Sequence, residues 1–189
     1  VFSCGLFAYR AFEYDKIADW IFTAVFASAA AYSHYFSLVS VGIIYGFLMI
    51  ASIRKKCFIK WLVFAFVIAA LYVPWLASFI SQLADKIEND YWIAPITLAT
   101  AADYFKTWFK CGNYTAAYLV GSFIIYILAA LGIFAEKKAK LRIPAILGVC
   151  VFILTNLTGI LASIVVRPVF IERYAIPAIP FLLFFAAEG

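Results

Sequence analysis

Long uncharged runs alternate with short charged segments along this chain of 189 residues, at 20–53, 61–84, 111–135, 143–166 and 174–187. A helix rises about 1.5 Å per residue, so it needs about 20 apolar residues to cross the hydrocarbon core of a bilayer. The second, third and fourth runs have the length of one such helix each. The pattern therefore predicts an all-α protein, a polytopic transmembrane helical bundle.

The first run, 20–53, is too long for one ordinary span, and it carries the polar group Ser33-His34-Tyr35 near its middle. Two short helices that meet at a polar turn are the favoured interpretation, and a single tilted helix is the alternative. The hairpin interpretation gives about six spans in a single transmembrane domain over residues 1–189. We expect spans at about 17–32, 35–52, 61–82, 114–135, 143–165 and 174–189, with a long loop at about 83–113.

Composition supports a membrane protein: 67% of the residues are hydrophobic, 20% are aromatic and 13% are charged, whereas soluble domains have about 25% charged residues. This excludes a single water-soluble domain, and the aromatic content excludes a disordered chain. The net charge of +5 is too dispersed for a nucleic-acid interface. Four distant cysteines without a C-x-x-C pair, and one histidine, predict neither a disulfide framework nor a metal site.

Basic residues set the expected orientation, because Lys and Arg in short loops are retained on the cytoplasmic side of a cell membrane. Loops 53–60 and 136–142 are rich in them and are predicted to be cytoplasmic. His34 and the segments 83–113 and 166–174 are then predicted to lie on the outer side. In the hairpin interpretation, Arg10 and Lys16 share the cytoplasmic side with the basic loops.

Small side chains suggest where helices pack, since close approach of backbones stabilises helix pairs in lipid. Gly42 and Gly46 have the small-x-x-x-small spacing, and residues 28–31 form a second small patch, Ser-Ala-Ala-Ala. We interpret both as packing surfaces.

Two groups of polar and aromatic residues are candidates for binding. An imidazole at membrane depth is costly unless it faces a cavity or a partner, so His34 with Tyr35 is either part of a site or a satisfied interfacial group. Tyr91 and Trp92 follow a charged stretch of the long loop. They either anchor this loop at the membrane interface or form part of a lid over a site.

A third candidate is the segment from Arg167 to Tyr174, which contains Arg167, Glu172 and Arg173 at the expected outer mouth of two spans. Arginine binds phosphate through a planar two-donor fork and could hold a lipid-linked phosphate there. The alternative is that these arginines contact lipid headgroups, with a local Glu172 pair that contributes little.

Four segments in this order resemble a known enzyme family: Ala31-Tyr-Ser-His-Tyr-Phe36, Tyr72-Val-Pro-Trp-Leu76, Tyr91-Trp-Ile-Ala-Pro95, and Arg167-Pro-Val-Phe-Ile-Glu-Arg-Tyr174 followed by Pro177 and Pro180. Together they resemble the bacterial protein-mannosyltransferase-like glycosyltransferases, the family 39 group of the GT-C fold. The resemblance covers about residues 17–187.

This resemblance implies a hexosyltransferase that moves a sugar from a polyprenyl-phosphate carrier, with inversion, to an acceptor on the outer face. The family's general base lies in the first outer loop, and we expect the chain to be an internal or C-terminal-side fragment that begins after it. No catalytic residue is therefore assigned. The expected substrate-binding residues are Arg173 with Tyr174 first, then Arg167, then His34 with Tyr35, together with Tyr91 and Trp92.

The resemblance implies a polyprenyl-phosphate sugar donor and membrane lipids as partners; it leaves the acceptor open. No cofactor is assigned to this part of the protein, and a divalent metal requirement stays open. A secondary transporter or lipid flippase is the alternative function, and a non-catalytic scaffold is a third. Transporters often contain inverted repeats and charges inside the membrane, but spans 61–84, 111–135 and 143–166 carry no charge and no internal repeat is present.

Overall fold

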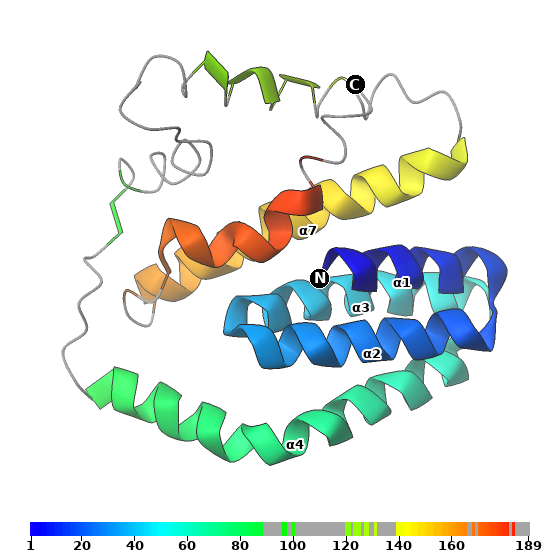
Figure 1. The fold of residues 1–189 in the computed structure, drawn as a ribbon, viewed down its shortest axis with the longest axis horizontal. Helices are drawn as coiled ribbons and strands as arrows, with labels where there is room; N and C mark the ends of the chain where they lie inside the picture. The colour runs from blue at the N-terminus through cyan, green and yellow to red at the C-terminus, as the bar shows by residue number, and fades with distance from the viewer. Residues whose placement is uncertain are drawn as a thin grey trace. The chain divides into compact units, whose positions relative to one another are not determined.

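The structure, a computed structural model, describes residues 1–88, 139–165 and 170–181, with isolated positions at 96–131, 168 and 183. In this part the regular structure is helical, without strands: α1 (Phe2–Tyr14), α2 (Ile17–Ser33), α3 (Tyr35–Arg54), α4 (Phe58–Glu88), α7 (Ala139–Val165) and the 3-10 helix η1 (Glu172–Ala178) (Figure 1). The chain divides into two compact units, Val1–Tyr91 and Trp92–Gly189. The all-α class predicted from the sequence is confirmed for the described residues.

Three segments in the described residues are long and apolar enough to cross a membrane: Tyr35–Arg54, Phe58–Gln82 and Ile146–Val165. Their mean hydropathies are 2.2, 2.2 and 2.1. Helix α2 is apolar but has only 17 residues, about 25 Å at 1.5 Å per residue. It is therefore shorter than an untilted crossing of the hydrocarbon core requires.

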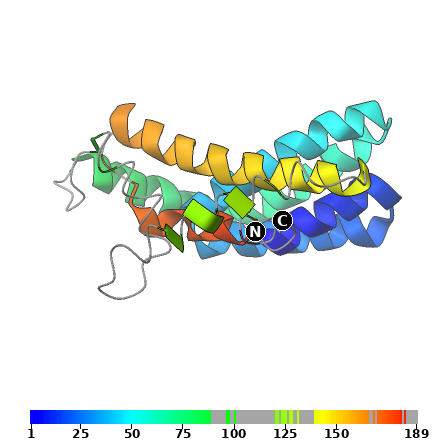
Figure 2. The same ribbon diagram turned by 90° about the horizontal axis from the view of Figure 1, so that it is seen from above.

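The first unit is built on close packing between α1, α2 and α3, three helices that run side by side (Figures 1 and 2). Mostly small side chains occupy the buried faces of α1 and α2, which lets the backbones approach closely. The buried positions are Cys4, Gly5, Ala8 and Ala11 in α1, then Asp19, Trp20, Thr23, Ala24, Ala27, Ala30 and Ala31 in α2, and Ser37, Ser40, Val41, Ile44, Tyr45, Leu48 and Ser52 in α3.

Within the described residues, no other helix closely approaches the Gly42–Gly46 pair, whose spacing suggested a packing surface. A Cβ atom added to either glycine would meet no atom within 4 Å. The buried face of α3 instead contains Val41, Ile44 and Tyr45. The second small patch does pack, since Ala30 and Ala31 are buried.

Helix boundaries differ from the predicted spans at several points. Helix α4 begins at Phe58 and continues to Glu88, so it extends into the predicted loop 83–113, and α7 begins at Ala139 inside the predicted loop 136–142. The predicted helix at 174–189 begins as the 3-10 helix η1, which contains Pro177. Proline has no N–H to donate within a helix, which disfavours regular α geometry there.

Helix α1 was not predicted, because its 13 residues are too few to span a membrane and include Arg10 and Glu13. It is held on α2 by an ion pair between Arg10 Nε and Asp19 Oδ1, 2.8 Å apart. Asp19 is 2% exposed. A buried carboxylate is costly unless it is paired, so Asp19 ties α1 to the first turn of α2.

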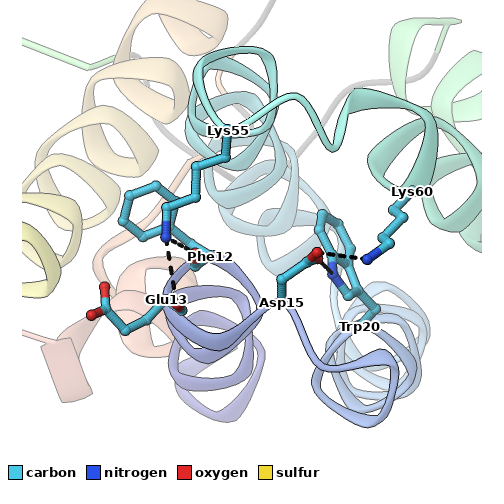
Figure 3. Close-up of polar contacts among 6 residues, drawn as sticks. All are labelled: Phe12, Glu13, Asp15, Trp20, Lys55 and Lys60. Carbon is cyan, nitrogen blue, oxygen red and sulfur yellow. Dashed lines mark hydrogen bonds and ion pairs between the residues drawn. The ribbon is translucent and has the colours of Figure 1, made fainter.

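Polar contacts join the α1–α2 connection to the α3–α4 connection (Figure 3). Asp15 accepts hydrogen bonds from Lys60 Nζ at 2.6 Å and from Trp20 Nε1 at 3.0 Å. Lys55 Nζ donates to the carbonyl oxygens of Phe12 and Glu13 at the end of α1. The two connections therefore lie at one end of the unit, as the hairpin interpretation of 17–52 requires.

The backbone conformation of Asp15 is one that commonly ends a helix. Asp15 ends α1 in the left-handed region, with φ 50°, and its N–H donates to Ala11 O. Asp tolerates this conformation better than most side chains. The hydrogen bond from Lys60 holds the pKa of Asp15 below its ordinary value.

A lowered folded-state pKa means that the Asp15 charge stabilises the fold above its ordinary pKa, and that this stability is lost as pH falls through the folded-state pKa. We expect Asp15→Asn, which suits the left-handed backbone and keeps an acceptor for Trp20, to cost up to about 1 kcal/mol near pH 6, because the pair is half-exposed. The difference should vanish toward pH 2. Thermal unfolding of the two proteins in detergent measures it, and a difference independent of pH would contradict the assignment.

Candidate functional site

An aromatic cluster forms where the end of α2 meets the middle of α4. The ring of Tyr32 lies 5.7 Å from the ring of Tyr72, edge to face, and 6.1 Å from the ring of Trp75. Tyr32 comes from the first segment of the resemblance and Tyr72 and Trp75 from the second. Two segments about 40 residues apart in the sequence are thus brought together.

Pro74 lies inside α4, close to the carbonyl group that accepts a hydrogen bond from Tyr32. A proline inside a helix removes one backbone hydrogen bond and displaces the preceding turn. The Tyr32 hydroxyl donates to the carbonyl oxygen of Leu71, three residues before Pro74, at 2.5 Å. The Tyr-Val-Pro-Trp segment supplies the rings, and Leu71, the residue directly before it, supplies the carbonyl that accepts from Tyr32.

Tyr35 extends the cluster toward the end of α4. Its ring lies 5.1 Å from the ring of Phe79, and its hydroxyl donates to Gln82 Oε1. Tyr72, Trp75, Phe79 and Gln82 fall on one face of α4 at helical spacing. We call the set Tyr32, Tyr35, Tyr72, Trp75, Phe79 and Gln82 the aromatic cluster.

The aromatic cluster has an open edge with polar groups. Tyr32 is 44% exposed, and Gln82 is exposed. The Tyr72 hydroxyl is buried and has no hydrogen-bond partner among the residues that the structure describes. Aromatic faces combined with a few hydroxyl and amide groups are typical of sites that bind a partly apolar, partly polar ligand.

His34 lies at the α2–α3 turn beside the cluster and caps α3. Its Nδ1 accepts a hydrogen bond from the backbone N–H of Phe36 at 3.1 Å, and its backbone is extended, as expected of a residue that precedes a helix. This contact uses Nδ1.

In the second unit, η1, which begins in the candidate segment, packs against α7. Phe170 is fully buried, and the N–H of Tyr174 donates to Ile171 O at 2.9 Å as η1 begins. Tyr174 is partly buried. Arg173 occupies the second position of η1.

Several predicted site residues lie outside the described residues: Tyr91, Trp92, Arg167 and the side chain of Arg173. Among the predicted residues that are described, Tyr35 joins the aromatic cluster and His34 adjoins it, both in the first unit. Tyr174 belongs to the second unit.

The sequence prediction did not include Phe79 and Gln82, and it quoted Tyr32, Tyr72 and Trp75 only as parts of motifs. The spacing of Tyr72, Trp75, Phe79 and Gln82 could have identified them. It marks one face of a helix. Only the tertiary structure shows that Tyr32 and Tyr35 meet that face.

Within the described residues, no group of three or more His, Cys, Asp or Glu side chains is arranged to hold a metal ion.

Comparison with known proteins finds no match to this chain among family models, curated proteins or solved structures.

The cap at His34 can be separated from a role in binding. We expect His34→Ala to destabilise the protein by about 1 kcal/mol because the N-cap is lost, whereas His34→Asn keeps a cap acceptor and unfolds close to wild type. Thermal unfolding of both variants in detergent measures this. Equal destabilisation by Ala and Asn would contradict the capping role.

Proposed function

We propose that this chain is part of a membrane glycosyltransferase, a hexosyltransferase that takes a sugar from a polyprenyl-phosphate-linked donor and transfers it to an acceptor on the outer face of the cell membrane. One observation carries the proposal beyond the sequence resemblance. The segments Ala31–Phe36 and Tyr72–Leu76, two of the four that carry the resemblance, meet in the aromatic cluster. Their meeting is what a shared binding site requires.

In this proposal the aromatic cluster binds the sugar and the first part of the lipid carrier. The rings of Tyr32 and Trp75 offer apolar faces, and the hydroxyl of Tyr35 and the amide of Gln82 offer hydrogen bonds at the open edge. The apolar surfaces of α3 and α4 suit an isoprenoid chain. Tyr91 and Trp92, which lie outside the described residues, are proposed as further substrate-binding residues.

Arg173, with Tyr174, is proposed to hold the lipid phosphate, and Arg167 to assist it. The carrier phosphate gains negative charge as the sugar leaves, and cationic donors fixed near it stabilise that charge best away from bulk water. A planar guanidinium can contact two phosphate oxygens at once. The general base is assigned to no residue of this chain.

Sidedness is part of the proposal. With about six spans, the basic segments 53–60 and 136–142 face the cytoplasm, and His34, the aromatic cluster and residues 83–113 and 166–174 face the outer side. The positive-inside rule supports this orientation. The shared position of Asp15, Lys55 and Lys60 at the other end of the first unit is compatible with it.

The test is sugar transfer by the full-length protein in membranes, with polyprenyl-phosphate sugar as donor. We expect Arg173→Ala to lower turnover about 100-fold or more, the loss typical of removing one fixed donor to a developing negative charge. Arg54→Ala is the matched control, because Arg54 is an exposed arginine at the basic end of α3. It should keep wild-type turnover.

Unchanged turnover in Arg173→Ala would remove Arg173 from the site. Absence of transfer by the wild-type protein, together with uptake of the lipid-linked or free sugar into vesicles, would contradict the glycosyltransferase and favour the transporter or flippase.

A further inference from the structure

The fully buried ring of Phe170 lies directly on Gly159 of α7. A Cβ atom added to Gly159 would lie 2.7 Å from Cγ and Cε2 of Phe170, and closer still to Cδ2. Carbon atoms in contact normally lie about 3.5–4.0 Å apart. Even the methyl group of alanine therefore does not fit unless the ring moves.

A hydrogen bond one turn further along α7 fixes the same residue. The backbone N–H of Phe170 donates to Ser163 Oγ at 2.9 Å, and the bond is buried. Gly159 and Ser163 are four residues apart and lie on the same face of the helix. Ring and backbone of Phe170 are thus held by two neighbouring positions of α7.

Without a close contact to accommodate, glycine would be an unfavourable residue at position 159 of α7. Glycine is among the least favourable residues in a helix interior, and a glycine there usually reflects a close approach of another group. Gly42 and Gly46 show the contrast, since an added Cβ meets nothing at either. The close approach at Gly159 is made by Phe170.

Phe170 precedes the turn that carries the phosphate-binding candidates. Ile171 O accepts from the N–H of Tyr174, and η1 begins at Glu172, so only two residues separate Phe170 from Arg173. A shift of Phe170 would also move the backbone of Arg173, because a connection of two residues has little conformational freedom.

We infer that Gly159 and Ser163 are positioning residues. By holding Phe170 against α7, they determine the position of the turn that contains Arg173 and Tyr174. The consequence for activity rests on the proposed glycosyltransferase function. The consequence for geometry does not, so the two can be tested separately.

The geometric arm uses the full-length protein with its native cysteines replaced and spin labels at positions 161 and 176, where Leu161 and Ile176 are exposed. We expect Gly159→Ala to shift or broaden the distance between the labels. Gly159→Ala/Phe170→Ala, which removes the ring that the new methyl group meets, should give the same distance as Phe170→Ala alone. An unchanged distance in Gly159→Ala would overturn the inference, whatever the protein's activity.

The activity arm measures sugar transfer by the same variants without labels. Gly159→Ala should lower kcat/KM for the polyprenyl-phosphate sugar at least tenfold while the amount of folded protein stays near wild type. Gly42→Ala is the matched control and should stay within twofold of wild type. The double variant should match Phe170→Ala, not the product of the two single losses.

The outcomes separate the two proposals. A shifted distance with an unchanged kcat/KM would show that Gly159 holds the turn in place but would contradict a role for the turn in sugar transfer. Absence of transfer by the wild-type protein would contradict the proposed function and leave the spin-label result to decide the geometric inference.

Discussion

Close approach of α1, α2 and α3 is the constraint on which the first unit depends. In lipid, helices gain no hydrophobic energy from associating, so they are held by packing between small side chains and by a few polar contacts. The buried positions Ala8, Ala11, Ala24 and Ala27 allow this approach. The polar contacts that complete it, from Arg10 to Asp19 and from Lys55 to the end of α1, lie near one end of the helices.

That arrangement gives the first unit two different ends. One contains the charged contacts around Asp15 and Lys60, and the other contains the aromatic cluster near Tyr32 and Gln82. They are separated by the length of α2, about 25 Å at 1.5 Å per residue. The proposed function, in which a lipid-linked substrate binds on one side of a membrane and basic residues lie on the other, needs such a division.

Periodicity and charge predicted the helical class and the break at His34, because a polar group in the middle of an overlong apolar run favours a turn between two helices. The sequence could not reveal α1, whose small buried face becomes visible only against α2 and α3. It pointed to Gly42 and Gly46 for packing, whereas Gly159, which it did not single out, is closely packed against Phe170. Spacing identifies small residues, and only the folded chain shows which of them another residue approaches.

The central claim is that the aromatic end and the basic end of the first unit face opposite sides of a membrane. Cysteine accessibility tests it most directly, with a single cysteine at Ser33 or at Lys56, both exposed, in full-length protein whose native cysteines are replaced. A membrane-impermeant thiol reagent added to intact cells should label Ser33→Cys at once and Lys56→Cys only after permeabilisation. Labelling of both positions from the same side would contradict the claim.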